Sequence, residues 1–196
     1  MLRRVVLLFP FLLAALPLPA EGARVRHLNL EEMTARAGRI LHGRCVDVDI
    51  HLDPDLNQVV TDVTLQVIRR TKGEDAGRIR FRLLGDQRME ASADGSLPGI
   101  PAFRRGEEVV VLLYPESGRG LTSPVGLGQG RFSVSTDKRG RRIAVNGYAN
   151  EGLFERLSPR ARERVERRLA GKPAAPELDL DLLLDLTVDL GGEVAP

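Results

Sequence analysis

The stretch that decides the fold is residues 97–114, which read LPGIPAFRRGEEVVVLLY. Two prolines and two glycines make its first part irregular, because proline fixes φ and glycine permits positive φ. Residues 109–114 then form a short, almost wholly apolar run that ends at Pro115. Its length, its valines and its turn boundaries favour a strand buried on both faces over a helix. The other apolar runs are interpreted as neighbours of this strand in one β-domain.

Residues 1–22 have the features of a secretory signal peptide. Two arginines lie within the first four residues, an apolar stretch broken by two prolines covers residues 5–18, and small residues follow at Ala20 and Gly22. The apolar stretch is too short to span a membrane. The sequence therefore predicts an exported protein, secreted or periplasmic, with no stable membrane insertion once the signal is removed.

Charge and cysteine content describe the rest of the chain. The 196 residues carry a formal net charge of +2, but six acidic and no basic residues follow Lys172, which predicts a basic body with an acidic tail. Cys45 is the only cysteine. An internal disulfide is therefore excluded, and a buried thiol in a strand is expected.

The residues before the central stretch predict one helix and three strands. Asn29 and Glu32 have capping-box spacing, which predicts a helix over residues 30–37. Gly43 is the expected place for a bend or bulge in the first strand. The three predicted strands are residues 39–52, 59–67 and 79–83.

After the central stretch, the pattern predicts a hairpin, a helix and an ambiguous tail. The hairpin turns at residues 137–140, and Ser158 with Pro159 marks the start of a helix over residues 160–170. In the tail, residues 177–193, every even-numbered position from 178 to 190 is leucine or valine. Alternation favours a strand and leucine content favours a helix, so both remain open. The tail either packs back on its own domain or extends as an acidic, disordered segment.

This order of elements predicts a mainly β protein, a small antiparallel barrel of the OB-like shape with a short N-terminal helix and a C-terminal helix. The predicted organisation has three parts: a signal peptide at residues 1–22, an OB-like domain at 23–156, and a C-terminal helix, linker and acidic tail at 157–196.

Four short motifs carry a family resemblance: HGRCV at residues 42–46, KG at 72–73, FRRGEEV at 103–109 and GLGQGRF at 126–132. Their order after a short helix resembles that of a family of secreted bacterial proteins with an OB-like barrel. More distantly the chain is similar to netrin-like modules, the barrel of tissue inhibitors of metalloproteases. The resemblance implies a fold and brings no catalytic residues, and the disulfides typical of netrin-like modules are absent.

No motif indicates catalysis, a metal or a cofactor. The chain has no His-Glu-x-x-His or Cys-x-x-Cys spacing, and His42 and His51 fall on opposite parities of the first strand, so they are expected on opposite faces. Asp53-x-Asp55-x-Asn57 opens like a calcium loop, but Gln58 occupies the position of the required glycine. A turn whose side chains cap backbone amides is expected instead.

The candidate ligand-binding residues are five arginines on the third strand and in the long loop at residues 85–106: Arg78, Arg80, Arg82, Arg104 and Arg105. The alternative is a solvated basic surface. Export and the absence of tryptophan argue against a nucleic-acid ligand. The predicted function is an exported, non-catalytic module that binds another protein or a surface polymer. The alternative is an inhibitor or chaperone of an exported protease.

Overall fold

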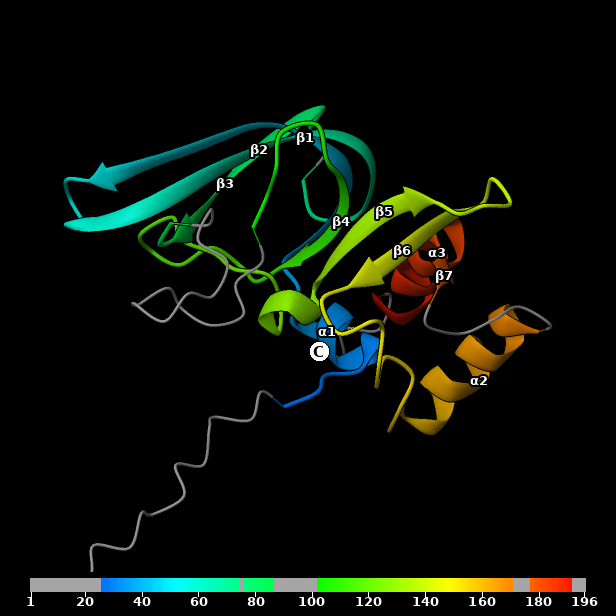
Figure 1. Cartoon of the computed structure of the whole chain (residues 1–196). Coiled ribbons are helices and arrows are strands. Elements are labelled where there is room, and N and C mark those ends of the chain that lie inside the picture. Colours follow the sequence, from blue (N-terminus) through cyan, green and yellow to red (C-terminus); the bar gives the residue numbers. More distant parts are fainter. Residues whose placement is uncertain (1–25, 75, 87–101, 171–176, 192–196) are drawn as a thin grey trace, which may run out of the picture.

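The computed structural model describes residues 26–74, 76–86, 102–170 and 177–191 (Figure 1). One antiparallel sheet has the strand order β3-β2-β1-β4-β5-β6-β7. In chain order the elements are α1 (Leu30–Arg36), β1 (Arg39–Asp53), β2 (Gln58–Lys72), β3 (Arg78–Leu84), β4 (Glu108–Leu113), the 3₁₀ helix η1 (Leu127–Gln129), β5 (Arg131–Thr136), β6 (Arg142–Asn146), α2 (Pro159–Leu169), β7 (Leu178–Asp179) and α3 (Leu180–Gly191).

The central strand is β4, as the sequence predicts. Residues 109–113 are all 0% exposed, so both faces of this strand are buried. It pairs with β1 on one side and with β5 on the other. A strand covered on both faces can be apolar at every position, which is the pattern in the sequence.

Two apolar clusters lie on opposite faces of the sheet. On one face, Phe81 and Phe103 pack edge to face with ring centroids 5.5 Å apart, within the curve of β1, β2 and β3. On the other face, α1 and α3 lie against the sheet around Leu112 and Phe132, and α2 packs against α3 (Figure 1). No helix in the described part of the chain is long and apolar enough to cross a membrane.

The capping box predicted for the first helix is present. The Asn29 side chain accepts a hydrogen bond from the Glu32 amide at 2.8 Å, and the Glu32 carboxylate accepts one from the Asn29 amide at 3.2 Å. The predicted turn after β1 is also confirmed. Asp53 Oδ1 accepts hydrogen bonds from the amides of Asp55 and Leu56, so this side chain caps the turn.

Strands β1 and β2 are both 15 residues long and form a hairpin that projects from the body (Figure 1). Three register shifts interrupt their pairing: one between Ile40 and Leu41, one at Gly43, where the sequence predicts it, and one between Cys45 and Asp47. The shift between Cys45 and Asp47 reverses the parity of β1, because one residue is inserted without a partner. The expectation that His42 and His51 face opposite sides is therefore wrong, since both lie on the face away from the Phe81 cluster.

The mainly β fold is confirmed, whereas the closed barrel is not. Among the described residues, β3 meets the chain ahead of β5 through a single parallel bridge between Arg82 and Leu121. One backbone hydrogen bond accompanies it, from the Thr122 amide to the Arg82 carbonyl at 2.9 Å. The sheet is therefore open between β3 and β5.

The acidic tail packs on its own domain, and it is mostly helical. Asp179 caps α3 by accepting a hydrogen bond from the Leu182 amide at 3.0 Å. Leu183 and Thr187 interrupt the even-numbered alternation and complete a helical stripe with Leu180 and Leu190, all of them buried. The strand alternative holds only for the two residues of β7, which pair with β6.

Charge pairs orient the docked tail. Arg69 of β2 contacts Asp185 at 2.7 Å, and Arg168 of α2 contacts Asp189 at 2.8 Å. Arg164 also donates a hydrogen bond to the Asp189 carbonyl at 2.6 Å. Of the two alternatives for the tail, packing on its own domain is therefore confirmed, and the disordered extension is wrong for residues 177–191.

Candidate ligand-binding site

The outward face of β1, β2 and β3, away from Phe81, carries rows of charged and polar side chains. Strand pairing sets these rows, because directly opposed residues share a face. From the base of the hairpin toward its tip, the rows are Arg44–Gln66–Arg78, Asp47–Thr64–Arg80 and Asp49–Asp62–Arg82.

Asp62 is the buried centre of this face, with 3% of its side chain exposed. Its carboxylate accepts hydrogen bonds from Arg80 at 2.6 Å and from Arg82 at 2.8 and 2.9 Å. Burial alone would raise the pKa of Asp62, but the hydrogen bonds from Arg82 and Arg80 hold it below its usual value. Arg82 also contacts Asp53 at 2.7 Å, so its charge is neutralised by carboxylates of the protein itself.

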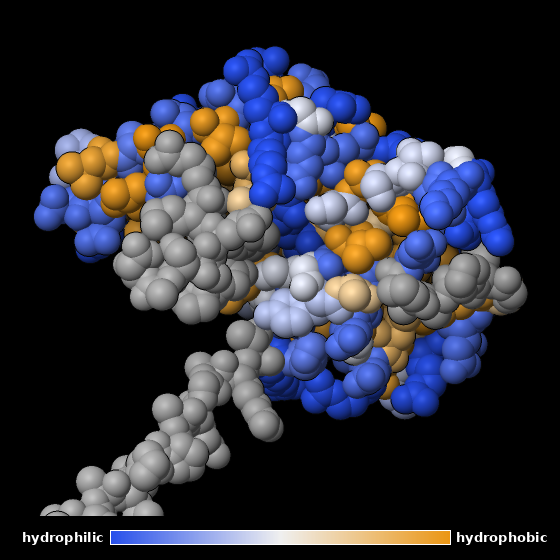
Figure 2. Space-filling model, viewed as in Figure 1, coloured by the Kyte–Doolittle hydropathy of each residue, from blue (hydrophilic) through white to orange (hydrophobic). Residues whose placement is uncertain are grey.

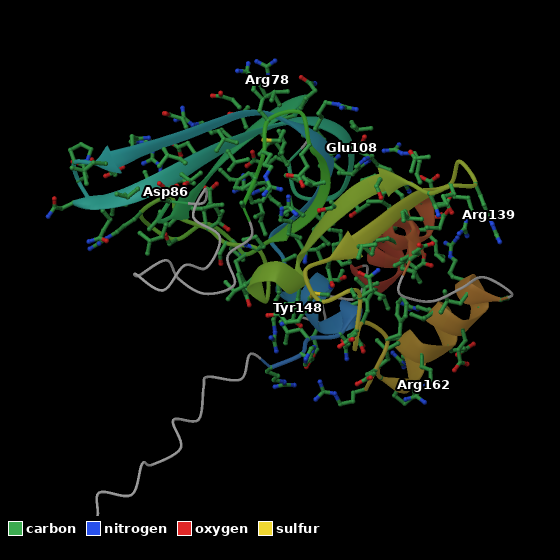
Figure 3. All side chains as sticks on the ribbon, viewed as in Figure 1. Arg78, Asp86, Glu108, Arg139, Tyr148 and Arg162 are labelled. Carbon is green, nitrogen blue, oxygen red and sulfur yellow. The ribbon has the colours of Figure 1, made fainter. Side chains whose placement is uncertain are left out.

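Three of the five predicted arginines converge on one pocket of about 580 Å³. Arg78 and Arg80 come from β3, and Arg105 comes from the turn before β4. Figure 3 shows Arg78 at the top of the molecule, where Figure 2 shows mainly hydrophilic side chains. The rest of the lining is Val46, Asp47 and Thr64.

Backbone pairing positions Arg105 beside the two strand arginines. The Gly106 amide donates to the Cys45 carbonyl, and the Cys45 amide donates to the Glu107 carbonyl, each at 2.7 Å. These bonds extend the pairing of β1 with β4 to the turn that carries Arg105. The buried Cys45 thiol lies beneath it, and burial, followed by the charge of Glu107, raises the pKa of this thiol.

The electrostatics of the pocket favour an anion. Arg80 is already paired with Asp62, whereas Arg78 and Arg105 are exposed and form no ion pair with any residue that the structure describes. Among the described lining residues, Asp47 is the only carboxylate, against three guanidinium groups, of which that of Arg80 is already paired with Asp62. Guanidinium groups bind carboxylate, sulfate and phosphate through paired hydrogen bonds, so the pocket can hold such a group.

The other predicted contact residues lie elsewhere. Arg104 is exposed, its amide donates to Glu107 Oε2 at 3.2 Å, and its side chain does not line the pocket. Most of the long loop, residues 87–101, falls outside the described residues, and so does the predicted signal peptide at residues 1–22.

A cluster around the partly buried Glu108 was not predicted from the sequence. His42 Nε2 lies 2.6 Å from Glu108 Oε1, Arg44 lies 3.4 Å from Glu108 Oε2, and Arg142 also contacts this carboxylate. Burial, followed by the charge of Arg142, lowers the pKa of His42 to about 4. His42 is therefore neutral at neutral pH and ties β1 to β4. The partners are too far apart in the sequence for any spacing motif to reveal them.

Asp49, His51 and Asp62 stand close enough to share a cation, with one ligand atom from each within 4.8 Å of the others. However, both oxygens of Asp62 already accept hydrogen bonds from Arg80 and Arg82. These guanidinium groups supply the positive charge that a metal ion would bring. Asp62 is therefore satisfied by the protein's own side chains, whereas His51 Nδ1 is buried and neither accepts nor donates a hydrogen bond among the described residues.

No protein-family model matches this chain, and no curated protein matches it in sequence. The fold and the pocket therefore define the class by themselves: an antiparallel β protein, covered by helices on one face, with an arginine-lined pocket on the outward face of β1–β3.

Proposed function

We propose that the protein is an exported, non-catalytic binding module that holds an anionic group of another protein or of a surface polymer. The observation that carries the proposal is the convergence of Arg78 and Arg105, two exposed arginines without an ion pair among the described residues, with Arg80 on one pocket. A purely solvated surface would spread such charges apart, since like charges repel.

The fold proposed for this module is an OB-like barrel that is partly open. Two features support it: the order β3-β2-β1-β4-β5, with long, bent β1 and β2, and the parallel bridge from Arg82 to Leu121, where the barrel would close. Barrels of this kind bind extended polymers on the face of their second and third strands. By analogy with that fold, the arginine pocket lies on the ligand-binding face.

The test is a titration with dextran sulfate, using neutral dextran as the matched polymer without charge. We expect binding of dextran sulfate that weakens as salt is added, because salt screens exposed charges. Arg78→Ala and Arg105→Ala should each weaken it by about tenfold, the value of one charge-assisted hydrogen bond.

Arg139→Ala is the control, since this exposed arginine lies in the turn between β5 and β6, far from Arg78 in Figure 3. Equal binding of dextran sulfate by all three variants would refute the proposal that this pocket binds the anionic group. A pull-down from the periplasm or the culture medium would then identify the partner, and an exported protease in the eluate would support the inhibitor alternative.

A further inference from the structure

In the part of the chain that the structure describes, most of the outer edge of β3, beside the arginine pocket, has no strand paired with it. On its inner side β3 bonds to β2, as the Val67 amide donates to the Gly77 carbonyl at 3.0 Å and the Gly85 amide donates to the Val59 carbonyl at 2.8 Å. In an antiparallel pair, alternate residues direct their backbone groups to the same neighbour. Residues 78, 80 and 82 therefore direct their amide and carbonyl groups away from β2.

Only one end of this edge is occupied by the described chain. The Thr122 amide bonds to the Arg82 carbonyl at 2.9 Å. The chain ahead of it folds into a turn, in which the Gly120 amide donates to the Ser117 carbonyl at 2.9 Å, and so it does not continue along β3. The backbone groups of Arg78 and Arg80 accordingly form no hydrogen bond with any described residue.

We propose that this edge binds an acidic peptide segment of a partner protein in extended conformation, as an added strand beside β3. The backbone of the peptide pairs with Arg78 and Arg80, and its acidic side chains, at alternate positions, meet the guanidinium groups of these residues and of Arg105. The inference rests on the proposed anion-binding function and names its ligand class.

Charge selects this occupant over a second copy of the chain. Pairing of two β3 edges would place arginine near arginine, and opposed like charges destabilise strand pairs. Charged side chains on an edge strand are a common protection against self-association. The same arginines attract an acidic strand, so the positive charge of this edge favours an acidic peptide over a second copy of the chain.

The experiment uses the whole mature chain and a fluorescein-labelled peptide in which glutamate alternates with valine. Two further peptides carry N-methyl groups, one on the glutamate amides and one on the valine amides. A strand bonds to a sheet edge through only every second residue, so only one set of methyl groups blocks pairing. We expect one methylated peptide to bind at least about tenfold more weakly and the other to bind like the parent. Equal binding of all three peptides would overturn the added strand.

Variants separate this inference from the proposed function. Arg78→Glu should weaken the binding of both the parent peptide and dextran sulfate, whereas Arg139→Glu should weaken the binding of neither. Thermal melting should show that both variants are folded. One possible result is that Arg78→Glu weakens the binding of dextran sulfate while both methylated peptides bind as tightly as the parent peptide. The anion pocket then stands and the strand pairing is refuted. If Arg78→Glu weakens neither ligand, the pocket itself is refuted.

Discussion

The docked tail offers the sharpest test of the fold, through the substitution Leu183→Ala in α3. Leu183 is 0% exposed and belongs to the apolar cluster that contains Met33, Ile40 and Phe132. Removing its side chain loses the transfer free energy of the buried atoms and leaves a cavity, which together destabilise by about 2–5 kcal/mol. For a chain of this size, each kcal/mol lowers the melting temperature by about 2–4 °C. We therefore expect Tm to fall by roughly 4–20 °C.

The control is Val188→Ala in the same helix, because Val188 is 48% exposed and should change the free energy of unfolding by less than about 0.5 kcal/mol. Differential scanning calorimetry measures both variants under the same conditions. Truncation after Gly171 removes seven buried leucines and should bring hydrophobic-dye binding and loss of the cooperative transition. If Leu183→Ala and Val188→Ala melt at the same temperature, α3 does not dock as described.

Three further outcomes are expected. Burial lowers the pKa of His42 from 6.5 to about 4 in the folded protein. The folded state is therefore most stable above pH 6.5, where this histidine is neutral in both states. The free energy of unfolding should decrease by about 3 kcal/mol as the pH falls from 6.5 toward 4. Urea unfolding across this range should show the loss, His42→Gln should reduce it, and an NMR titration midpoint of His42 near 6.5 would contradict it. Val111→Asp should abolish the folded state seen by circular dichroism, because burying an unpaired carboxylate costs several kcal/mol, on the scale of a domain's total stability. N-terminal sequencing of the protein from its host should begin near Glu21 or Ala23, and an intact Met1 would rule out the signal peptide.

The arginine site was partly visible in the sequence. Alternation along residues 78–83 places the arginines of β3 on one face, and this is confirmed. The different fate of Arg82 could not be predicted, because its partners Asp53 and Asp62 lie on other strands and meet it only through strand register. Arg105 joins the pocket because β1 and β4 pair, which is likewise a contact between distant parts of the chain.

The parity of β1 shows a second limit of sequence patterns. His42 and His51 have opposite parity when residues are counted, yet the register shift between Cys45 and Asp47 places them on the same face. Gly43 marks one irregularity, since glycine permits a close approach of backbones there: a Cβ at this position would lie 2.6 Å from the Gln66 carbonyl oxygen. No residue type marks the shift between Cys45 and Asp47.

The sequence by itself determined what depends on neighbouring residues: the capping box at Asn29, the turn at Asp53, the doubly buried strand at residues 109–113 and the separation of basic body from acidic tail. These features follow from local dihedral preferences and from periodicity within a few residues. Only the tertiary structure decided whether the tail is helix or strand, which arginines are neutralised and whether the sheet closes. These outcomes depend on contacts between residues far apart in the chain, whose burial and charge pairing override local preference.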